Sequence, residues 1–416
     1  MGTIRWTGGA KLTAQVRTGT ITGYDVATTY TVTIGNKTIS SVGTGGTVST
    51  TATALVALLN ASTEPEFSEI TWTANGSAGA VTGTDDNPGR AFTFTLTVSG
   101  GTGTRTAAAD TTANSGPNDV GLAANYDTGA LPTAADDLYI DSTDVSLLYN
   151  LDALTAVALT SLTIGQNFTG YIGLPKINTD GSTAYPEYRQ DYFQIQSSAV
   201  TIGNGPGTGS GRIKIDNRSG TAATVNVLNT GTPAETGLEA VLWKGTHASN
   251  VVNVFSGSVG IAGYPGELAT VATLRVGNEG NSSNASVRAT TGVTLTTINQ
   301  YAGEVEINSA ATTINLLGGD MTIRGAGAVT TITIDNGASL TYNSTGTITT
   351  LTVGPNSAFV VDDRAKTITN KVSLYSGCTF TDDAGILTLT AGFQTVRCRL
   401  EDVSIGLGVN RSYTVA

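Results

Sequence analysis

A short frame that repeats in tandem constrains the fold of this chain more than any other feature. In each copy, two apolar residues separated by one residue are followed, three positions after the second, by Gly or Asn; the one exception is Gln300, at the second apolar position of its copy. Ile332, Ile334 and Gly337 form one copy, within TTITIDNGASLTYNSTG. From Ile298 onwards, successive copies begin 16, 18, 19, 21 and 15 residues apart. Copies at such intervals indicate a repeat architecture, whereas Asn336-Gly337 alone would suggest a hairpin turn.

The frame has a direct physical interpretation as one coil of a solenoid. Alternation places one side chain inward and the next outward, and a residue that tolerates positive φ then turns the chain sharply. One coil cannot bury its inward residues alone, but stacked neighbours bury them together. We predict a mainly β protein with a single-stranded parallel β-helix; a β-sandwich, or a pair of them, is the alternative. The predicted corner glycines are Gly205, Gly257, Gly303, Gly319, Gly337, Gly377 and Gly392.

Composition changes along the chain divide it into four segments. Residues 1–24 are polar and Gly-rich and are expected to form an extended N-terminal arm. Residues 25–100 read as strands around a helix over 49–61, a small α+β domain. Residues 101–117 are rich in Gly, Thr and Ala and are predicted to be a linker. The β-helix is expected over 118–416.

The predicted helix is the one segment with a clear helical pattern. Leu55, Leu58 and Leu59 fall on one face and are expected to pack against the small sheet. Ser49 or Thr50 is expected to cap its N-terminus.

Charge and composition exclude several functional classes. The chain has 21 Lys plus Arg against 32 Asp plus Glu, a net charge of −11, which argues against sequence-independent nucleic-acid binding. No apolar run is long enough for a membrane span, and the N-terminus has no secretory signal pattern, so a soluble chain made in a cytoplasm is expected. Cys378 and Cys398 are the only cysteines, and a bridge between them is not favoured in that compartment.

Two acidic pairs are the candidates for chemistry. If their coils stack, matching side chains lie about 4.8 Å apart, a separation that suits glycoside hydrolysis or calcium binding. Solvated turn residues are the favoured interpretation, and neither a metal nor a cofactor is expected. The pairs are Asp362 with Asp363 and Asp382 with Asp383.

Few other residues suggest catalysis. His247 is the only histidine, so a zinc site made of histidines is excluded, and its context reads as a loop. Trp243 and the aromatic run 185–193, YPEYRQDYF, could stack on sugar rings; aromatic residues at a loop or subunit interface are the favoured explanation.

Two segments resemble known virion and surface architectures. Residues 118–141 contain Asn125-Tyr126, Gly129, Pro132 and Asp136-Asp137, and resemble an entry segment of β-helical surface proteins, although a tryptophan often found there is missing. The stretches TYTVTIGNKTIS, ALVALLNAS and AFTFTLTVS are similar to a small fold found in bacteriophage virion proteins.

This resemblance implies a non-enzymatic structural protein of a bacteriophage particle, a capsid decoration, head-fibre or tail-associated component. Its expected location is the virion, assembled in the host cytoplasm. Its expected partners are the major capsid protein or other virion proteins, and a homotrimer would cover the end coils. The alternatives are a tail-associated glycan-binding protein or polysaccharide depolymerase, and a bacterial surface protein. The residues expected to anchor the arm on the particle are Arg5, Trp6, Lys11 and Arg17.

Overall fold

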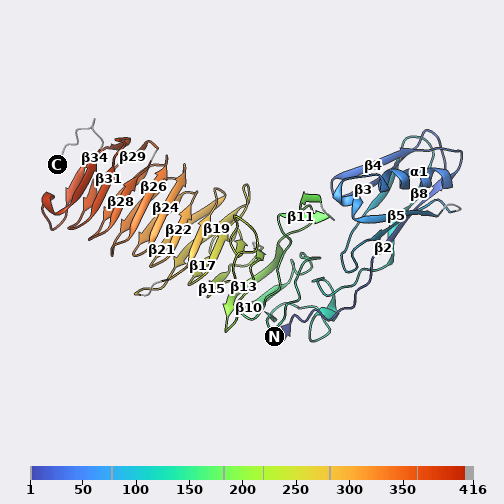
Figure 1. Cartoon of the computed structure of the whole chain (residues 1–416), viewed down its shortest axis with the longest axis horizontal. Helices are drawn as coiled ribbons and strands as arrows, with labels where there is room; N and C mark the ends of the chain where they lie inside the picture. The colour runs from blue at the N-terminus through green and yellow to red at the C-terminus, as the bar shows by residue number, and fades with distance from the viewer. Residues whose placement is uncertain are drawn as a thin grey trace.

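Parallel pairing between successive coils dominates the molecule. Figure 1 shows the coils as a regular stack from β10, in green, to β34, in red. The computed structural model describes residues 2–75, 78–180, 183–218, 220–280, 283–362 and 364–407. Within these residues the chain is mainly β, and its long parallel ladders form a β-helix. The central prediction from the repeat is therefore confirmed.

Each coil contributes one strand to a first sheet, or two short strands in the last coils, and through most of the stack one to a second sheet. The first sheet consists of β1 (Thr3–Arg5), β9 (Asp137–Ile140), β10 (Ala158–Gly165), β13 (Phe193–Asn204), β15 (Thr224–Val227), β17 (Val251–Val254), β19 (Ala269–Val276), β21 (Val293–Gln300), β23 (Ala311–Leu316), β25 (Val329–Ile334), β27 (Ile348–Val353), β29 (Lys366–Ile368), β30 (Val372–Leu374), β32 (Leu387–Leu389) and β33 (Phe393–Thr395). The start of β13 also pairs with the second sheet, which consists of β14 (Ile213–Asn217), β16 (Val241–Lys244), β18 (Ser258–Ile261), β20 (Ser286–Ala289), β22 (Glu304–Ile307), β24 (Asp320–Gly325), β26 (Ser339–Ser344), β28 (Ala358–Val361), β31 (Thr379–Asp382) and β34 (Ser404–Leu407).

The Asn336-Gly337 turn shows why local and tandem patterns suggest different folds. Both residues have positive φ, +54° and +75°. Ala338 N donates to Asp335 O at 3.1 Å, an ordinary hydrogen-bond distance, and closes the turn. This is the backbone that a two-residue hairpin uses. However, β25 pairs with β23 and β27, while β26 pairs with β24 and β28. The turn is therefore a corner between two sheets.

Alternation within each strand builds the core of the stack. In β25, Ile332 and Ile334 are fully buried, whereas Thr331 and Thr333 face outward and are half-buried. Ile332 lies in register with the equivalent residue of the coil on either side. Apolar ladders of this kind continue through one core cluster from the N-terminal coil to Phe393.

The predicted corner glycines all adopt the left-handed conformation, with φ between +75° and +87°. Five of them connect a strand of the first sheet to the next strand of the second sheet: Gly257, Gly303, Gly319, Gly337 and Gly377. The other two have different places. Gly205 precedes a loop that leads to β14, and Gly392 lies between β32 and β33, which both belong to the first sheet.

Residues before the β-helix form a separate N-terminal unit, drawn in blue in Figure 1. It contains α1 (Val48–Asn60), α2 (Pro65–Ser68) and two antiparallel sheets. The four-stranded sheet has the order β5 (Ile70–Asn75), β6 (Ala80–Asp85), β2 (Val16–Gly23) and β8 (Thr104–Thr112), and the three-stranded sheet has the order β4 (Lys37–Val42), β3 (Thr29–Ile34) and β7 (Thr95–Ser99).

The segment predicted as an extended arm, residues 1–24, instead supplies paired strands to both parts of the molecule. β1 pairs with β9 of the β-helix, and β2 is a central strand of the N-terminal unit. The reason is that the first coil of a solenoid has an apolar end that must be covered. Ile4 and Trp6 cover it and are buried in the core there. Similarly, the predicted linker 101–117 contains β8, an edge strand of that unit.

The helix lies within one residue of its predicted position, with two differences in detail. Thr47 is its N-cap, because the Thr47 hydroxyl accepts from Thr50 N at 3.1 Å; the expected caps Ser49 and Thr50 lie inside the helix. Leu55 and Leu59 are fully buried as expected, but Leu58 is 46% exposed. The packed face is completed by Thr51, Ala52 and Val56 instead.

The remaining elements are short. They are the antiparallel hairpin of β11 (Ile177–Asp180) and β12 (Thr183–Pro186), and the 3₁₀ turns η1 (Ala123–Asn125) and η2 (Leu400–Asp402). No helix among the described residues is both long and apolar enough to cross a membrane.

Candidate functional site

The four residues expected to anchor an arm are used largely inside the molecule. Arg5 pairs with Asp141, and Arg17 pairs with Asp110 at 2.6 Å. Trp6 is 2% exposed and packs edge-on against Tyr126, with ring centroids 5.4 Å apart. Lys11 is exposed. Trp6 is therefore a core residue, and the arginines have partners within the chain.

Trp6 also clarifies the entry segment at 118–141. Its indole lies against Tyr126 of this segment, and its Nε1 donates to Val145 O at 3.0 Å. Asn125 is fully buried and holds three backbone groups: its Oδ1 accepts from Ala10 N, and its Nδ2 donates to Gly116 O and Asp119 O. The segment is thus an N-terminal cap of the β-helix.

The register offsets the two acidic pairs by one residue, so that only Asp362 and Asp383 continue at matching positions on neighbouring coils. Val360 is in register with Thr381, so Asp382 continues beside Val361, one residue before Asp362. Asp382 is fully buried and accepts from Ile386 N and Leu387 N at 3.0 and 3.1 Å, whereas Asp362 is exposed. Asp383 is exposed, and Asp363 lies outside the described residues. The frame itself holds, since Thr352 is in register with Ser373 and Leu351 therefore matches Val372, but Asp362 lies 11 residues after Leu351 whereas Asp382 lies 10 residues after Val372.

A buried ionic cluster joins the N-terminal unit to the β-helix, and we call it the Glu69 cluster. Glu69 is 4% exposed and lies just after α2. It pairs with Arg90 at 2.8 Å within its own unit and with Arg189 of the β-helix at 2.9 Å. The Tyr188 hydroxyl donates to Glu69 at 3.1 Å, and the Tyr185 hydroxyl donates to its other oxygen. Figure 1 shows the β11 hairpin, from which this aromatic run continues, reaching toward the blue unit.

Carboxylates and arginines alternate in the Glu69 cluster, with Asp85 and Glu187 as the second partners of Arg90 and Arg189. Burial raises the pKa of the Asp85 carboxyl, although Arg90 donates to it at 2.9 Å and opposes the shift. Burial also acts on Glu187, but the hydrogen bond and charge of Arg189 outweigh it and hold the pKa of Glu187 below its ordinary value. The pKa of Arg189 is raised because the carboxylates around it outweigh its desolvation. The carboxylates and the arginines are paired at 2.8 to 2.9 Å, so the contact is polar and directional.

A second buried cluster lies where loops cover the outer face of the second sheet. Lys214, in β14, is fully buried and donates to Leu174 O at 2.7 Å, with Glu235 at 3.2 Å. Burial lowers the pKa of Lys214, and the nearby carboxylates oppose this shift. One coil on, Lys244 pairs with Glu267 at 2.8 Å. Since Lys214 has no exposed surface, it is a structural group that ties the loops to the sheet.

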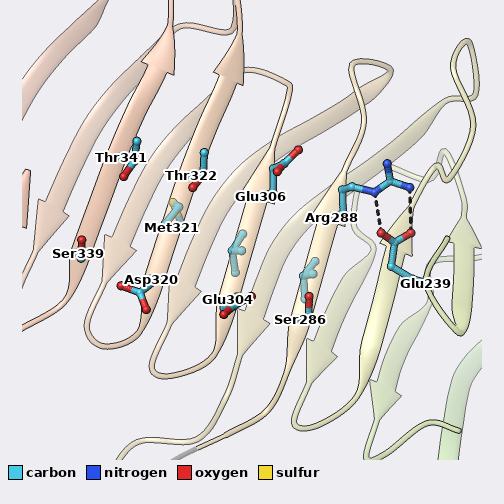
Figure 2. A pocket seen from close by; sticks show the side chains of 12 residues that line it. Glu239, Ser286, Arg288, Glu304, Glu306, Asp320, Met321, Thr322, Ser339 and Thr341 are labelled. Atoms are coloured by element: carbon cyan, nitrogen blue, oxygen red, sulfur yellow. Dashed lines mark hydrogen bonds and ion pairs between the residues drawn. The ribbon is translucent and has the colours of Figure 1, made fainter. Parts of the chain in front are cut away.

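Beyond these loops the second sheet is open, and its outer face forms a groove of about 510 Å³. Figure 2 shows the side chains of β20, β22, β24 and β26 projecting from this face. Arg288 donates to both oxygens of Glu239, at 2.6 and 3.1 Å, at the edge nearest the loops. Glu304 and Asp320 lie in register on neighbouring strands. The pair concentrates negative charge at one place in the groove. Like charges directly opposite each other are unfavourable, so this arrangement is not explained by stability.

The remaining candidates from the sequence have structural places. Trp243 is fully buried inside the β-helix and cannot stack on a sugar. The aromatic run 185–193 lies at an interface, as favoured, but the interface is within the chain. His247 Nδ1 accepts from Ser249 N at 3.1 Å in a loop, and Cys378 and Cys398 are both free. Across the residues that the structure describes, no three His, Cys, Asp or Glu side chains are grouped to hold a metal ion.

Sequence patterns did not predict the Glu69 cluster or the groove. Glu69 and Arg189 are 120 residues apart; Glu69 lies in a segment without a motif, and the aromatic run that contains Arg189 does not indicate its partner. The groove carboxylates Glu304 and Asp320 do have a signal, since each directly follows a predicted corner glycine.

Comparison of the chain with protein-family models, with curated proteins and with solved structures finds no match.

Proposed function

We propose that the chain is a non-enzymatic structural component of a bacteriophage particle, a capsid decoration or head-fibre protein anchored by its N-terminal region. The observation that carries the proposal is the Glu69 cluster, which fixes a separate folded unit at one end of a long β-helical stack. A rod with a firmly held unit at its end suits attachment at that end and projection of the rest. The phage assignment rests on the resemblance of the N-terminal strands and helix to a small virion fold.

Exposed apolar residues on the N-terminal unit support docking through it. Val42 in β4 and Leu58 in α1 are 57% and 46% exposed, on elements that pack against each other. Single exposed apolar residues are common, but these two lie on the unit that would face the particle. The proposed partners are the major capsid protein or other virion proteins, and the proposed location is the virion, assembled in the host cytoplasm.

Quantitative mass spectrometry of gradient-purified particles tests the proposal. Particles of the phage that encodes this chain are expected to contain it at a fixed copy number. A chain carrying Val42→Asp and Leu58→Asp is expected to lose most of its incorporation, because charge at an apolar contact is unfavourable. The control is Leu268→Asp, at a residue of the β-helix that is 63% exposed, which should incorporate normally. Absence of the native chain from purified particles would refute the proposal.

The groove supports a second candidate, a tail-associated glycan-binding protein or depolymerase. Glu304 and Asp320 lie in register on neighbouring strands. Neighbouring strands are about 4.8 Å apart, and the two carboxyl groups of retaining glycosidases are roughly 5 Å apart. If this candidate is correct, Glu304→Gln or Asp320→Asn abolishes cleavage of capsular polysaccharide by the purified chain, while Thr341→Val does not. The structural proposal predicts no cleavage by any of these proteins, including the native one.

A further inference from the structure

The outer face of the first sheet carries almost no charge from β10 to β27, although the same columns continue into Asp137 of β9 and Arg5 of β1, and we call the part from β10 to β27 the neutral face. It is defined by two columns of outward residues, which run in register across nine strands from β10 to β27. One column runs from Ser161 to Thr350 and the other from Thr163 to Thr352. Arg275 is the only charged residue in either column, and no residue of the two columns is buried.

This neutrality contrasts with the rest of the molecule. The chain has a net charge of −11, and the equivalent outward positions of the second sheet include Arg288, Glu304, Glu306 and Asp320. Two copies of an acidic chain repel each other, and the repulsion is greatest where carboxylates oppose one another. A face without carboxylates is the one at which a second copy meets least repulsion.

The neutral face is also regular and held in place. Its C-terminal part consists mainly of threonines, including Thr313 and Thr331 in register. Its asparagines bond laterally between coils: Asn253 donates to Asn226 and Asn315 donates to Asn299, each at 2.9 Å. Side chains that are already fixed lose little conformational freedom on association.

The size of the face is sufficient for a stable contact. Nine strands about 4.8 Å apart span about 38 Å, and two columns about 7 Å apart make a strip about 15 Å wide with their side chains. The strip covers about 570 Å² on each copy, so two copies would bury about 1,100 Å², just above the roughly 1,000 Å² expected of a specific interface.

We infer that the neutral face is a self-association surface, and that its partner is a second copy of this chain. The inference deepens the proposed structural role, on which it rests for its biological meaning. Its measurement uses purified chain alone, so it can fail while the chain is still found in particles, or succeed while it is not.

Analytical ultracentrifugation of the full chain tests the inference. At micromolar concentration the native chain is expected to sediment with two or three times the mass of one chain. Thr313→Glu combined with Thr331→Glu adds two charges to the neutral face and should weaken association at least tenfold. The matched control, Thr322→Glu with Thr341→Glu, adds the same two charges to the groove face and should leave association unchanged.

Circular dichroism establishes that the variants keep their β structure. If the variant with the glutamate pair fails to fold, Thr331→Arg is used instead. An added charge of either sign meets the same charge on the second copy and repels it, so tenfold weaker association is again expected. A monomeric native chain would overturn the inference. Equal dissociation by the control pair, or unchanged association of folded neutral-face variants, would overturn it as well.

Discussion

Glu69→Ala is expected to release the N-terminal unit from the β-helix. The change leaves Arg90 and Arg189 each with one carboxylate fewer, and leaves the hydroxyls of Tyr185 and Tyr188 without the acceptor they share. Removing one partner of a buried ion pair costs about 3–5 kcal/mol, since the remaining charge stays desolvated. Each arginine keeps a second carboxylate, Asp85 or Glu187, so the loss should fall at the lower end of that range.

Limited proteolysis and small-angle scattering would measure this release. The variant should be cut faster in the segments that connect the two parts, and its scattering should indicate a broader range of shapes. Glu64→Ala is the matched control, because Glu64 pairs with Lys37 at 2.7 Å on the surface, where such pairs contribute at most about 1 kcal/mol. Equal behaviour of the two variants would show that the Glu69 cluster does not hold the unit in place.

Phe359→Ala is expected to destabilise the C-terminal coils by about 3–5 kcal/mol, the usual cost of removing a buried aromatic side chain. Phe359 is fully buried and in register with Leu340 and Phe380. Its ring lies 6.2 Å from Tyr342 and 5.2 Å from Phe380, between centroids. The replacement therefore opens a cavity that two neighbouring coils share.

The position of the loss is as informative as its size. Stability in a solenoid is approximately a sum of contacts between neighbouring repeats, so hydrogen exchange should accelerate most in β26, β28 and β31 and least in the N-terminal coils. Val360→Ala, at the outward residue next along the same strand, should change stability by about 0.5 kcal/mol or less. Uniform acceleration along the whole chain would contradict a repeat-by-repeat stack.

The repeat was predictable because its causes are local. Alternation sets which residues point inward, and a positive-φ residue sets the corner, so Ile332, Ile334 and Gly337 contain what one coil requires. Stacking then follows, since a single coil leaves its apolar side uncovered. The helix was located in the same way, with two errors: Leu58 was assigned to the buried face, and the cap was placed at Ser49 or Thr50 instead of Thr47.

The contacts that join distant segments were not predictable in this way. Ile4 and Trp6 lie in a polar, Gly-rich segment that resembles a free arm, and only the open first coil makes them core residues. Glu69 pairs with Arg189 because the β11 hairpin lies beside the N-terminal unit, and no periodicity in the sequence predicts that position. The acidic pairs differ from expectation for a smaller reason: their offsets within the frame differ by one residue, and a shift of one residue moves a side chain to the opposite side of a strand, so Asp382 is buried whereas Asp362 is exposed.

Cryo-electron microscopy of purified particles is the most direct test of the structural role. We expect density for this chain at defined positions on the particle. The N-terminal unit should lie against the surface, and the strands should stack outward about 4.8 Å apart. Particles that lack such density, with the chain recovered only from the soluble fraction of the lysate, would contradict it.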